Sequence, residues 1–109
     1  MGMSQTFARV QDLVSRGEIR VSLHGLEELQ SDSVRVRDVI AGVKNGEVVD
    51  DYPEYGKGPC VLVLQRDSDG EPIHIVWGIP HGASGPAVIV TGYRPTGDRW
   101  SDDFLRRRP

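Results

Sequence analysis

The chain has 109 residues, of which 38% are hydrophobic and 27% are charged, and its formal net charge is −3. This composition is typical of a globular protein with one core and argues against a disordered chain. The negative net charge gives no support to nonspecific electrostatic binding of nucleic acid. No apolar run reaches the ~20 residues that are needed to span a bilayer.

The chain holds one cysteine, Cys60, so it can form no intramolecular disulfide, which is consistent with a reducing compartment. Cys60 opens an apolar run without a CxxC partner or a nearby basic cluster, and we interpret it as a packed hydrophobe rather than a nucleophile. The first residues lack the basic and apolar regions of a signal peptide, and we therefore expect a cytoplasmic protein with no membrane contact.

No internal repeat or long linker divides the chain, and we expect a single α+β domain over residues 6–104. Residues 1–5 are interpreted as a flexible N-terminus or a remnant of expression. Residues 105–109 contain three consecutive arginines and are predicted to form a basic C-terminal tail. Such a run is typically solvated, and contact with nucleic acid is the alternative.

Three segments in the first half have helical periodicity. Over residues 6–17 the apolar positions recur every three or four residues, with Thr6 as the candidate N-cap. A brief alternation follows, and Ser22 can then cap a second short helix that carries three leucines. A third helix is predicted over residues 36–45, where valine or isoleucine recurs at i, i+3, i+4 and i+7 before an Asn-Gly pair.

The second half has the shorter apolar runs of strands. We predict strands over residues 47–53, 60–66, 73–79 and 87–95, with a turn at 68–70 between the second and third. Short connections between consecutive strands favour an antiparallel meander. The predicted fold is therefore α+β, with N-terminal helices packed on one face of a four-stranded antiparallel sheet and the other face open to solvent or a partner.

His24 lies in the first turn of the second predicted helix, with Glu27 and Glu28 three and four positions later on the same side. A carboxylate beside an imidazole can fix its tautomer and support general acid–base chemistry. The alternative is an ordinary exposed histidine with helical charge pairs. A metal site would need further ligands, and only His74, His81 and distant acids remain, so we predict no metal and no cofactor.

The strands carry the other candidate binding residues. His74 lies opposite the apolar face of its strand, either as a tolerated polar residue or as part of a shallow site with the last strand. Thr91 and Tyr93 share one face of that last strand. Tyr93 with Arg94 can hold a phosphate or stack on a base, and Arg20 can join them in space. The alternative is that Tyr93 and Trp100, folded back as an apolar lid, seal the end of the sheet.

Four stretches together, "VSLHGLEEL", "VRVRDVIAGVKNGEVVDDYP", "GPCVLVLQRDSDGEPIHIVWGI" and "AVIVTGYRPTGDRW", resemble the family known as domain of unknown function 4258. The resemblance covers roughly residues 18–100. That family looks like a relative of the RelE- and barnase-like fold of bacterial ribonuclease toxins, which implies a helices-then-sheet order.

By this resemblance His24 and Tyr93 are the candidate catalytic residues, with His24 as general acid or base. Arg94 and Tyr93 would contact RNA or phosphate, while His74 and Thr91 match recurrent polar positions. Family members commonly carry an arginine about four residues after the helix histidine. Here that position is Glu28, which would repel a phosphate rather than stabilise its charge.

Two hypotheses of different class follow. The favoured one is a non-catalytic module that holds a partner protein, or a second copy of itself, on its open sheet face or an edge strand. The alternative is a metal-independent ribonuclease with RNA as its partner. It would use His24 to move the proton and Arg94 or Arg20 to stabilise the phosphate, and it requires these residues and Tyr93 in one cleft.

Overall fold

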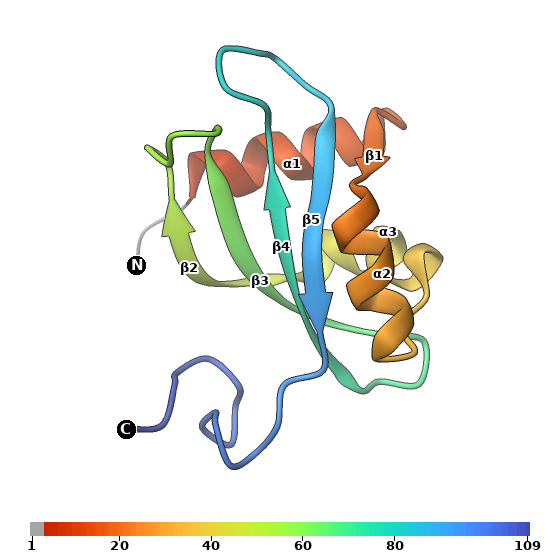
Figure 1. Ribbon diagram of the computed structural model, residues 1–109, viewed down its shortest axis with the longest axis vertical. Helices are drawn as coiled ribbons and strands as arrows, with labels where there is room; N and C mark the ends of the chain where they lie inside the picture. The colour runs from red at the N-terminus through yellow and green to blue at the C-terminus, as the bar shows by residue number, and fades with distance from the viewer. Residues whose placement is uncertain (1–3) are drawn as a thin grey trace.

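The computed structural model describes residues 4–109, which form one α+β unit in which helices cover one face of a twisted sheet (Figure 1). The elements in chain order are α1 (Gln5–Ser15), β1 (Ile19–Val21), α2 (Leu23–Ser31), α3 (Val36–Gly42), a short 3-10 helix (Val43–Asn45), β2 (Glu47–Tyr52), β3 (Cys60–Arg66), β4 (Pro72–Gly78) and β5 (Ala87–Tyr93). The three predicted helices and four predicted strands are all present.

The sheet has five strands in the order β1-β5-β4-β3-β2, and it is mixed rather than antiparallel. The meander from β2 to β5 is antiparallel as expected. The four-strand prediction is wrong because β1 pairs with β5 in parallel, with Ile19 opposite Ala87. β1 has only three residues and lies far along the chain from its partner, so local alternation could not identify it as a strand.

The N-terminal helix begins earlier than expected. Ser4 is its N-cap, and the Ser4 Oγ accepts a hydrogen bond from the Phe7 backbone N–H at 3.0 Å, so Thr6 lies inside the helix. Ser4 and Gln5 therefore belong to the folded domain rather than to the flexible segment predicted for residues 1–5, of which residues 1–3 lie outside the described part of the chain.

α2 runs along the edge of β5, directly after β1 (Figure 1). Ser22 caps it as predicted, accepting from the Gly25 N–H at 2.8 Å, and its hydroxyl also donates to the Val90 carbonyl at 3.1 Å. A Cβ at Gly25 would lie 2.6 Å from the Ile89 carbonyl oxygen, so only a glycine allows α2 to lie this close to the backbone of β5. The serine and the glycine around His24 thus fix the helix to the sheet.

The core lies between the covered sheet face and the helices. α1 and α3 supply Phe7, Val10, Leu13 and Val39 against alternating residues of β3, β4 and β5, and α2 adds Leu29. Two linked hydrogen bonds between buried polar groups cross this core. The Trp77 indole N–H donates to the Gln65 side chain at 2.8 Å, and the Gln65 amide donates to the Val39 carbonyl at 2.8 Å.

Replacing Gln65 by leucine should therefore lower the free energy of unfolding by about 2 kcal/mol, because the Trp77 N–H and the Val39 carbonyl would both lose their buried partner. Urea denaturation monitored by circular dichroism measures the change. Gln11→Leu is the matched control, since the Gln11 amide also donates to helical carbonyls but is only half-buried. Equal losses in the two variants would contradict this account of Gln65.

The opposite sheet face is not fully open. The C-terminal segment Trp100–Arg108, called here the C-terminal strap, folds back under the end of this face. Trp100 is 5% exposed, and its ring centroid lies 4.3 Å from that of His74 on β4. Arg107 lies over the Trp100 ring and pairs with Asp50 of β2 at 3.3 Å. The prediction that Trp100 folds back as an apolar lid is confirmed. The strap covers only one half of this sheet face, and the other half is exposed.

Candidate functional site

His74 lies on the sheet face predicted for it, yet it is fully buried at 0% exposure beneath the C-terminal strap. Its Nε2–H donates to the Phe104 carbonyl at 2.9 Å, since a carbonyl can only accept, and its Nδ1 then accepts from the Tyr93 hydroxyl at 3.2 Å. Both ring nitrogens are therefore occupied. The expectation of an outward-facing histidine on an open sheet face is wrong because Trp100 and Phe104 of the strap cover this position, which the sequence did not reveal.

The surroundings of His74 favour its neutral form. Burial lowers the pKa of His74, and the nearby positive charge of Arg107 lowers it further, outweighing the hydrogen bond to the Phe104 carbonyl. Burial likewise raises the pKa of the half-buried Tyr93 above its ordinary value. At neutral pH this pair is an uncharged, hydrogen-bonded unit, in which the His74 ring is closed to solvent while Tyr93 is half-buried.

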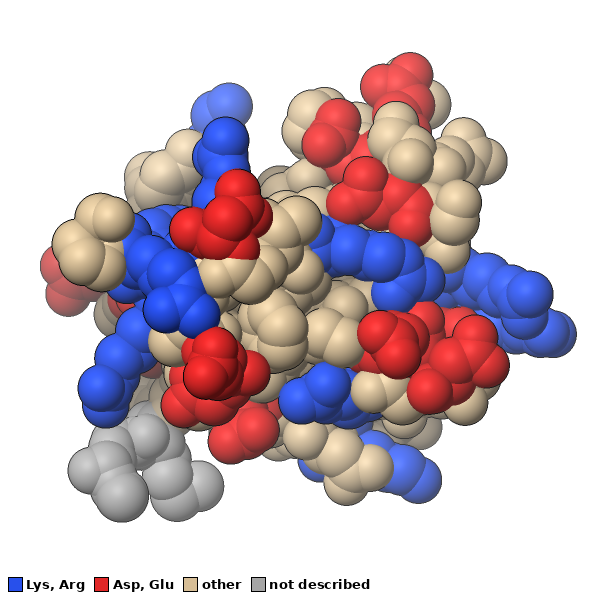
Figure 2. Space-filling view, turned by 90° about the horizontal axis from the view of Figure 1, so that it is seen from below, with Lys and Arg blue, Asp and Glu red and all other residues tan. Residues whose placement is uncertain are grey.

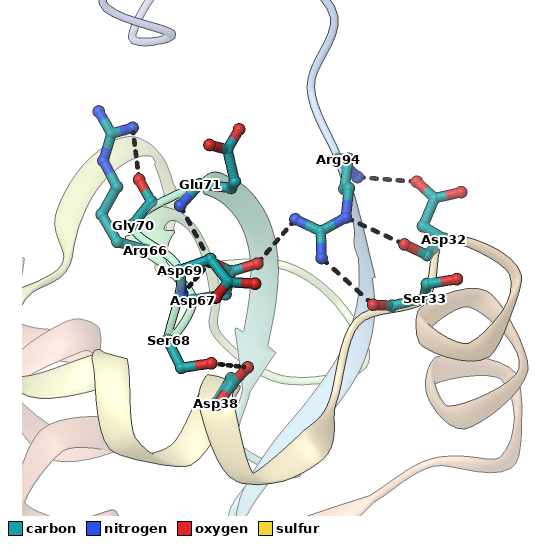
Figure 3. Close-up of polar contacts among 10 residues, drawn as sticks. All are labelled: Asp32, Ser33, Asp38, Arg66, Asp67, Ser68, Asp69, Gly70, Glu71 and Arg94. Atoms are coloured by element: carbon teal, nitrogen blue, oxygen red, sulfur yellow. Dashed lines mark hydrogen bonds and ion pairs between the residues drawn. The ribbon is translucent and has the colours of Figure 1, made fainter.

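Arg94 connects three separate parts of the chain (Figure 3). Its guanidinium pairs with Asp67 of the β3–β4 loop at 3.0 Å and donates to the carbonyls of Asp32 and Ser33, which follow α2, at 3.0 and 3.2 Å. The Arg94 backbone N–H also donates to the Asp32 carboxylate at 2.7 Å. These contacts use most of its donors, so Arg94 clamps the fold together rather than presenting a free cation.

Asp67 is the buried partner of this clamp, with its side chain 5% exposed. Burial alone would raise the pKa of Asp67, but hydrogen bonds from the backbone N–H groups of Glu71 and Asp69 and the Arg94 guanidinium together hold it below its ordinary value. The carboxylate therefore remains ionised at neutral pH and fixes both Arg94 and the turn of its own loop.

The remaining candidates lie apart from this cluster. Arg20 pairs in register with Val88, five residues before Tyr93 on β5, which places them roughly 17 Å apart along the strand. Thr91 pairs with Val76 between them and is half-buried. His24 is exposed, and within residues 4–109 its side chain makes no hydrogen bond or ion pair. His24, Arg20 and the Tyr93–Arg94 pair therefore do not form one cleft.

A pocket of about 360 Å³, called here the sheet pocket, lies on the exposed half of the sheet face. Its floor comes from β3, β4 and β5, and Arg20 of β1 and the β2–β3 loop form its walls. The lining residues are Arg20, Tyr55, Lys57, Gly58, Pro59, Cys60, Gly78, Ile79, Pro80, Val88 and Val90. Of these only Arg20 was a candidate from sequence, because no local pattern connects Tyr55 or Lys57 with β5.

Two features decide what the sheet pocket can do chemically. Burial raises the pKa of the Cys60 thiol, and the nearby Asp51 carboxylate raises it further, so this thiol is a poor nucleophile. Within the described residues neither Arg20 nor Lys57 has an acidic side chain in ion-pair range, so both remain available to an anionic group. The pocket is suited to binding rather than to nucleophilic chemistry.

Charge is mixed over the end of the molecule where the C-terminal strap lies. In Figure 2 both basic and acidic side chains cover this face, and acidic groups border the band of basic side chains on its right half. Residues 4–109 contain no cluster of three or more His, Cys, Asp or Glu side chains able to hold a metal ion. In the same range no helix is long and apolar enough to cross a membrane.

Comparison with known families identifies the chain. The model of the family described as "Domain of unknown function (DUF4258)" matches residues 21–94, which is more than half of the chain, and the chain therefore belongs to that family. The resemblance predicted from the sequence is confirmed. No curated protein and no solved structure matches the chain, so the relation to RelE- and barnase-like ribonucleases stays a prediction.

Proposed function

We propose that this member of the DUF4258 family is a non-catalytic module that binds a protein partner in the sheet pocket. The occupant is an extended segment in which an acidic side chain neighbours an apolar one. The observation that carries the proposal is the pairing of an apolar floor with two uncommitted cations, Arg20 and Lys57, on the half of the sheet face that the C-terminal strap leaves free.

The pocket has the features of a small binding site. Tyr55 is 55% exposed and Val90 is 37% exposed, so an aromatic and an aliphatic side chain both offer unburied area to a partner. Tyrosine and arginine are enriched among the residues that dominate binding energy at protein interfaces. A volume of about 360 Å³ accommodates one or two side chains, at the lower end of the range for ligand pockets.

The positive charges of Arg20 and Lys57, on the two walls of the pocket, favour an acidic partner. A carboxylate placed between Arg20 and Lys57 would gain from both cations, whereas a basic segment would be repelled. Charge complementarity of this kind contributes mainly to specificity and association rate, while burial of an apolar side chain over Val88 and Val90 supplies affinity. An acidic and apolar segment therefore fits both parts of the pocket.

The alternative function, a ribonuclease, requires its candidate residues to lie in one cleft, and they do not. Its four residues lie in different places: Arg20 lies in the sheet pocket, Tyr93 and Arg94 lie at the other end of β5, and His24 lies outside the sheet pocket on α2. Arg94 is held by Asp67, and Tyr93 donates to His74. A general base and a phosphate-stabilising cation must both reach one substrate, and this arrangement does not provide that.

NMR titration with the peptides acetyl-Asp-Leu-Asp-Leu-amide and acetyl-Asn-Leu-Asn-Leu-amide tests the proposal. We expect the acidic peptide to shift the amide signals of Lys57, Cys60 and Val90, and to bind about tenfold more tightly than the neutral one. The double variant Arg20→Gln with Lys57→Gln should remove this preference, while Arg16→Gln, an exposed arginine of the α1 C-terminus, should leave it intact. Shifts located elsewhere, or equal binding of both peptides, would refute the proposal.

A further inference from the structure

A second pocket, called here the arginine pocket, lies between the end of β5 and the C-terminal strap, and it has a volume of about 640 Å³. The segment that leaves β5 forms one side and the strap forms the other. The lining residues are Tyr93, Arg94, Pro95, Thr96, Asp98, Arg99, Trp100, Arg107, Arg108 and Pro109. Their side chains include four arginines and one aspartate, so the side-chain lining is cationic although the whole chain is acidic.

The four arginines differ in how firmly they are held. Arg94 is fixed by Asp67 and two carbonyls. Arg107 lies over the Trp100 ring and makes one ion pair, at 3.3 Å with Asp50, through a side chain that is 63% exposed. Arg108 donates to the Gly97 carbonyl and to Asp102, whose side chain is fully exposed. Arg99 has no side-chain hydrogen bond or ion pair within residues 4–109.

These contacts leave guanidinium N–H donors available to a ligand. An exposed ion pair contributes only about 0–1 kcal/mol, so a more highly charged anion can replace Asp102 or Asp50 at little cost. Guanidinium groups present their N–H donors in a planar fork that matches two phosphate oxygens at once. A hydrogen bond from the Thr96 side chain lowers the pKa of Asp98, so this carboxylate stays ionised and subtracts one charge from the lining.

We propose that the arginine pocket binds a small, multiply charged phosphate compound, with Arg99 and Arg108 as the principal donors and Arg107 as a third cation at the rim. The inference is independent of the sheet pocket, which lies on the other half of the sheet face. It extends the function proposed above, because it assigns a second ligand of a different chemical class to the domain.

The surrounding charge favours a small anion over a nucleic acid. Nucleic-acid binding relies on many cations that follow the phosphate backbone beyond a single pocket. On this end of the molecule acidic side chains border the basic ones (Figure 2), and the chain carries a net charge of −3. A long polyanion would meet those acids, whereas a compound confined to the pocket would meet mainly arginines.

Isothermal titration calorimetry at constant ionic strength with inorganic phosphate and pyrophosphate tests the proposal. We expect pyrophosphate to bind, and the double variant Arg99→Gln with Arg108→Gln to bind it at least roughly tenfold more weakly. The matched control is Arg37→Gln, an exposed arginine on α3, which should retain the wild-type affinity. Far-UV circular dichroism confirms that each variant is folded.

Two results would overturn the assignment. Undetectable pyrophosphate binding, or equal binding by the double variant and the wild type, would show that the pocket is not an anion site. A single-stranded oligonucleotide that binds more tightly than pyrophosphate, and loses that affinity in the double variant, would show that the ligand is a nucleic acid. A peptide result for the sheet pocket decides neither question, so the two proposals can fail separately.

Discussion

Arg94→Ala is expected to lower the free energy of unfolding by roughly 3 kcal/mol, the largest loss we expect from any single charged residue in this fold. The substitution leaves Asp67 ionised with its side chain 5% exposed, and it removes the donors that satisfy the Asp32 and Ser33 carbonyls. Removing one partner of a buried pair is costly because the other charge remains unpaired. The partial exposure of Arg94 keeps the loss at the lower end of that range.

A double-mutant cycle separates the ion pair from the two carbonyl contacts. Asp67→Asn keeps the acceptor for the Asp69 and Glu71 N–H groups, so its effect isolates the charge. If the pair dominates, the double variant should be little less stable than Arg94→Ala alone in urea denaturation. Arg16→Ala, which breaks ion pairs of an exposed arginine, is the control and should change stability by less than about 0.5 kcal/mol. A comparable loss in both arginine variants would contradict the clamp.

The clamp shows what the sequence could and could not predict about the candidate site. Tyr93 and Arg94 were identified as chemically notable residues, and Arg94 does recognise carboxylate and carbonyl oxygens. Its partners, however, come from the end of α2 and from the β3–β4 loop, and no local spacing indicates that these meet. A free cation and a structural clamp have the same sequence signature, and only the tertiary contacts distinguish them.

The fold was predicted more completely because its signals are local. Helical spacing located α3, and the period-two alternation of β4 placed His74 on the face away from the core. The two largest failures involve long-range pairing. β1 is a strand only because β5 offers it a parallel edge, and His74 is buried only because the C-terminal strap returns to cover it. Neither partner can be identified from the residues next to β1 or His74.

These long-range contacts also organise the surface. The C-terminal strap covers one half of the sheet face and leaves the other half exposed with Arg20 and Lys57 at its rim. The strap at the same time forms one wall of the arginine pocket. The strap therefore shapes the arginine pocket directly through Trp100, Arg107 and Arg108, whereas the residues that line the sheet pocket all lie outside the strap.

The domain should become less stable as the pH falls below about 6.5, and His74 should be the main cause. Burial and Arg107 lower the pKa of His74 in the folded state below the ordinary value of 6.5, whereas the unfolded chain keeps that value. The unfolded state then binds more protons in this range, so stability is full above pH 6.5 and declines as the pH falls toward the folded pKa. One proton gives a slope of at most about 1.4 kcal/mol per pH unit.

Urea denaturation at pH 7.5, 6.5 and 5.5 measures this slope, because the carboxylates, with ordinary pKa values near 4, contribute little in this range. His74→Gln retains an N–H donor for the Phe104 carbonyl but cannot be protonated, so it should be less stable at pH 7.5 and nearly independent of pH. His24→Gln should keep the wild-type slope, since His24 is exposed. Should His74→Gln keep that slope instead, the proton would bind elsewhere, and the strap would not depend on a neutral His74.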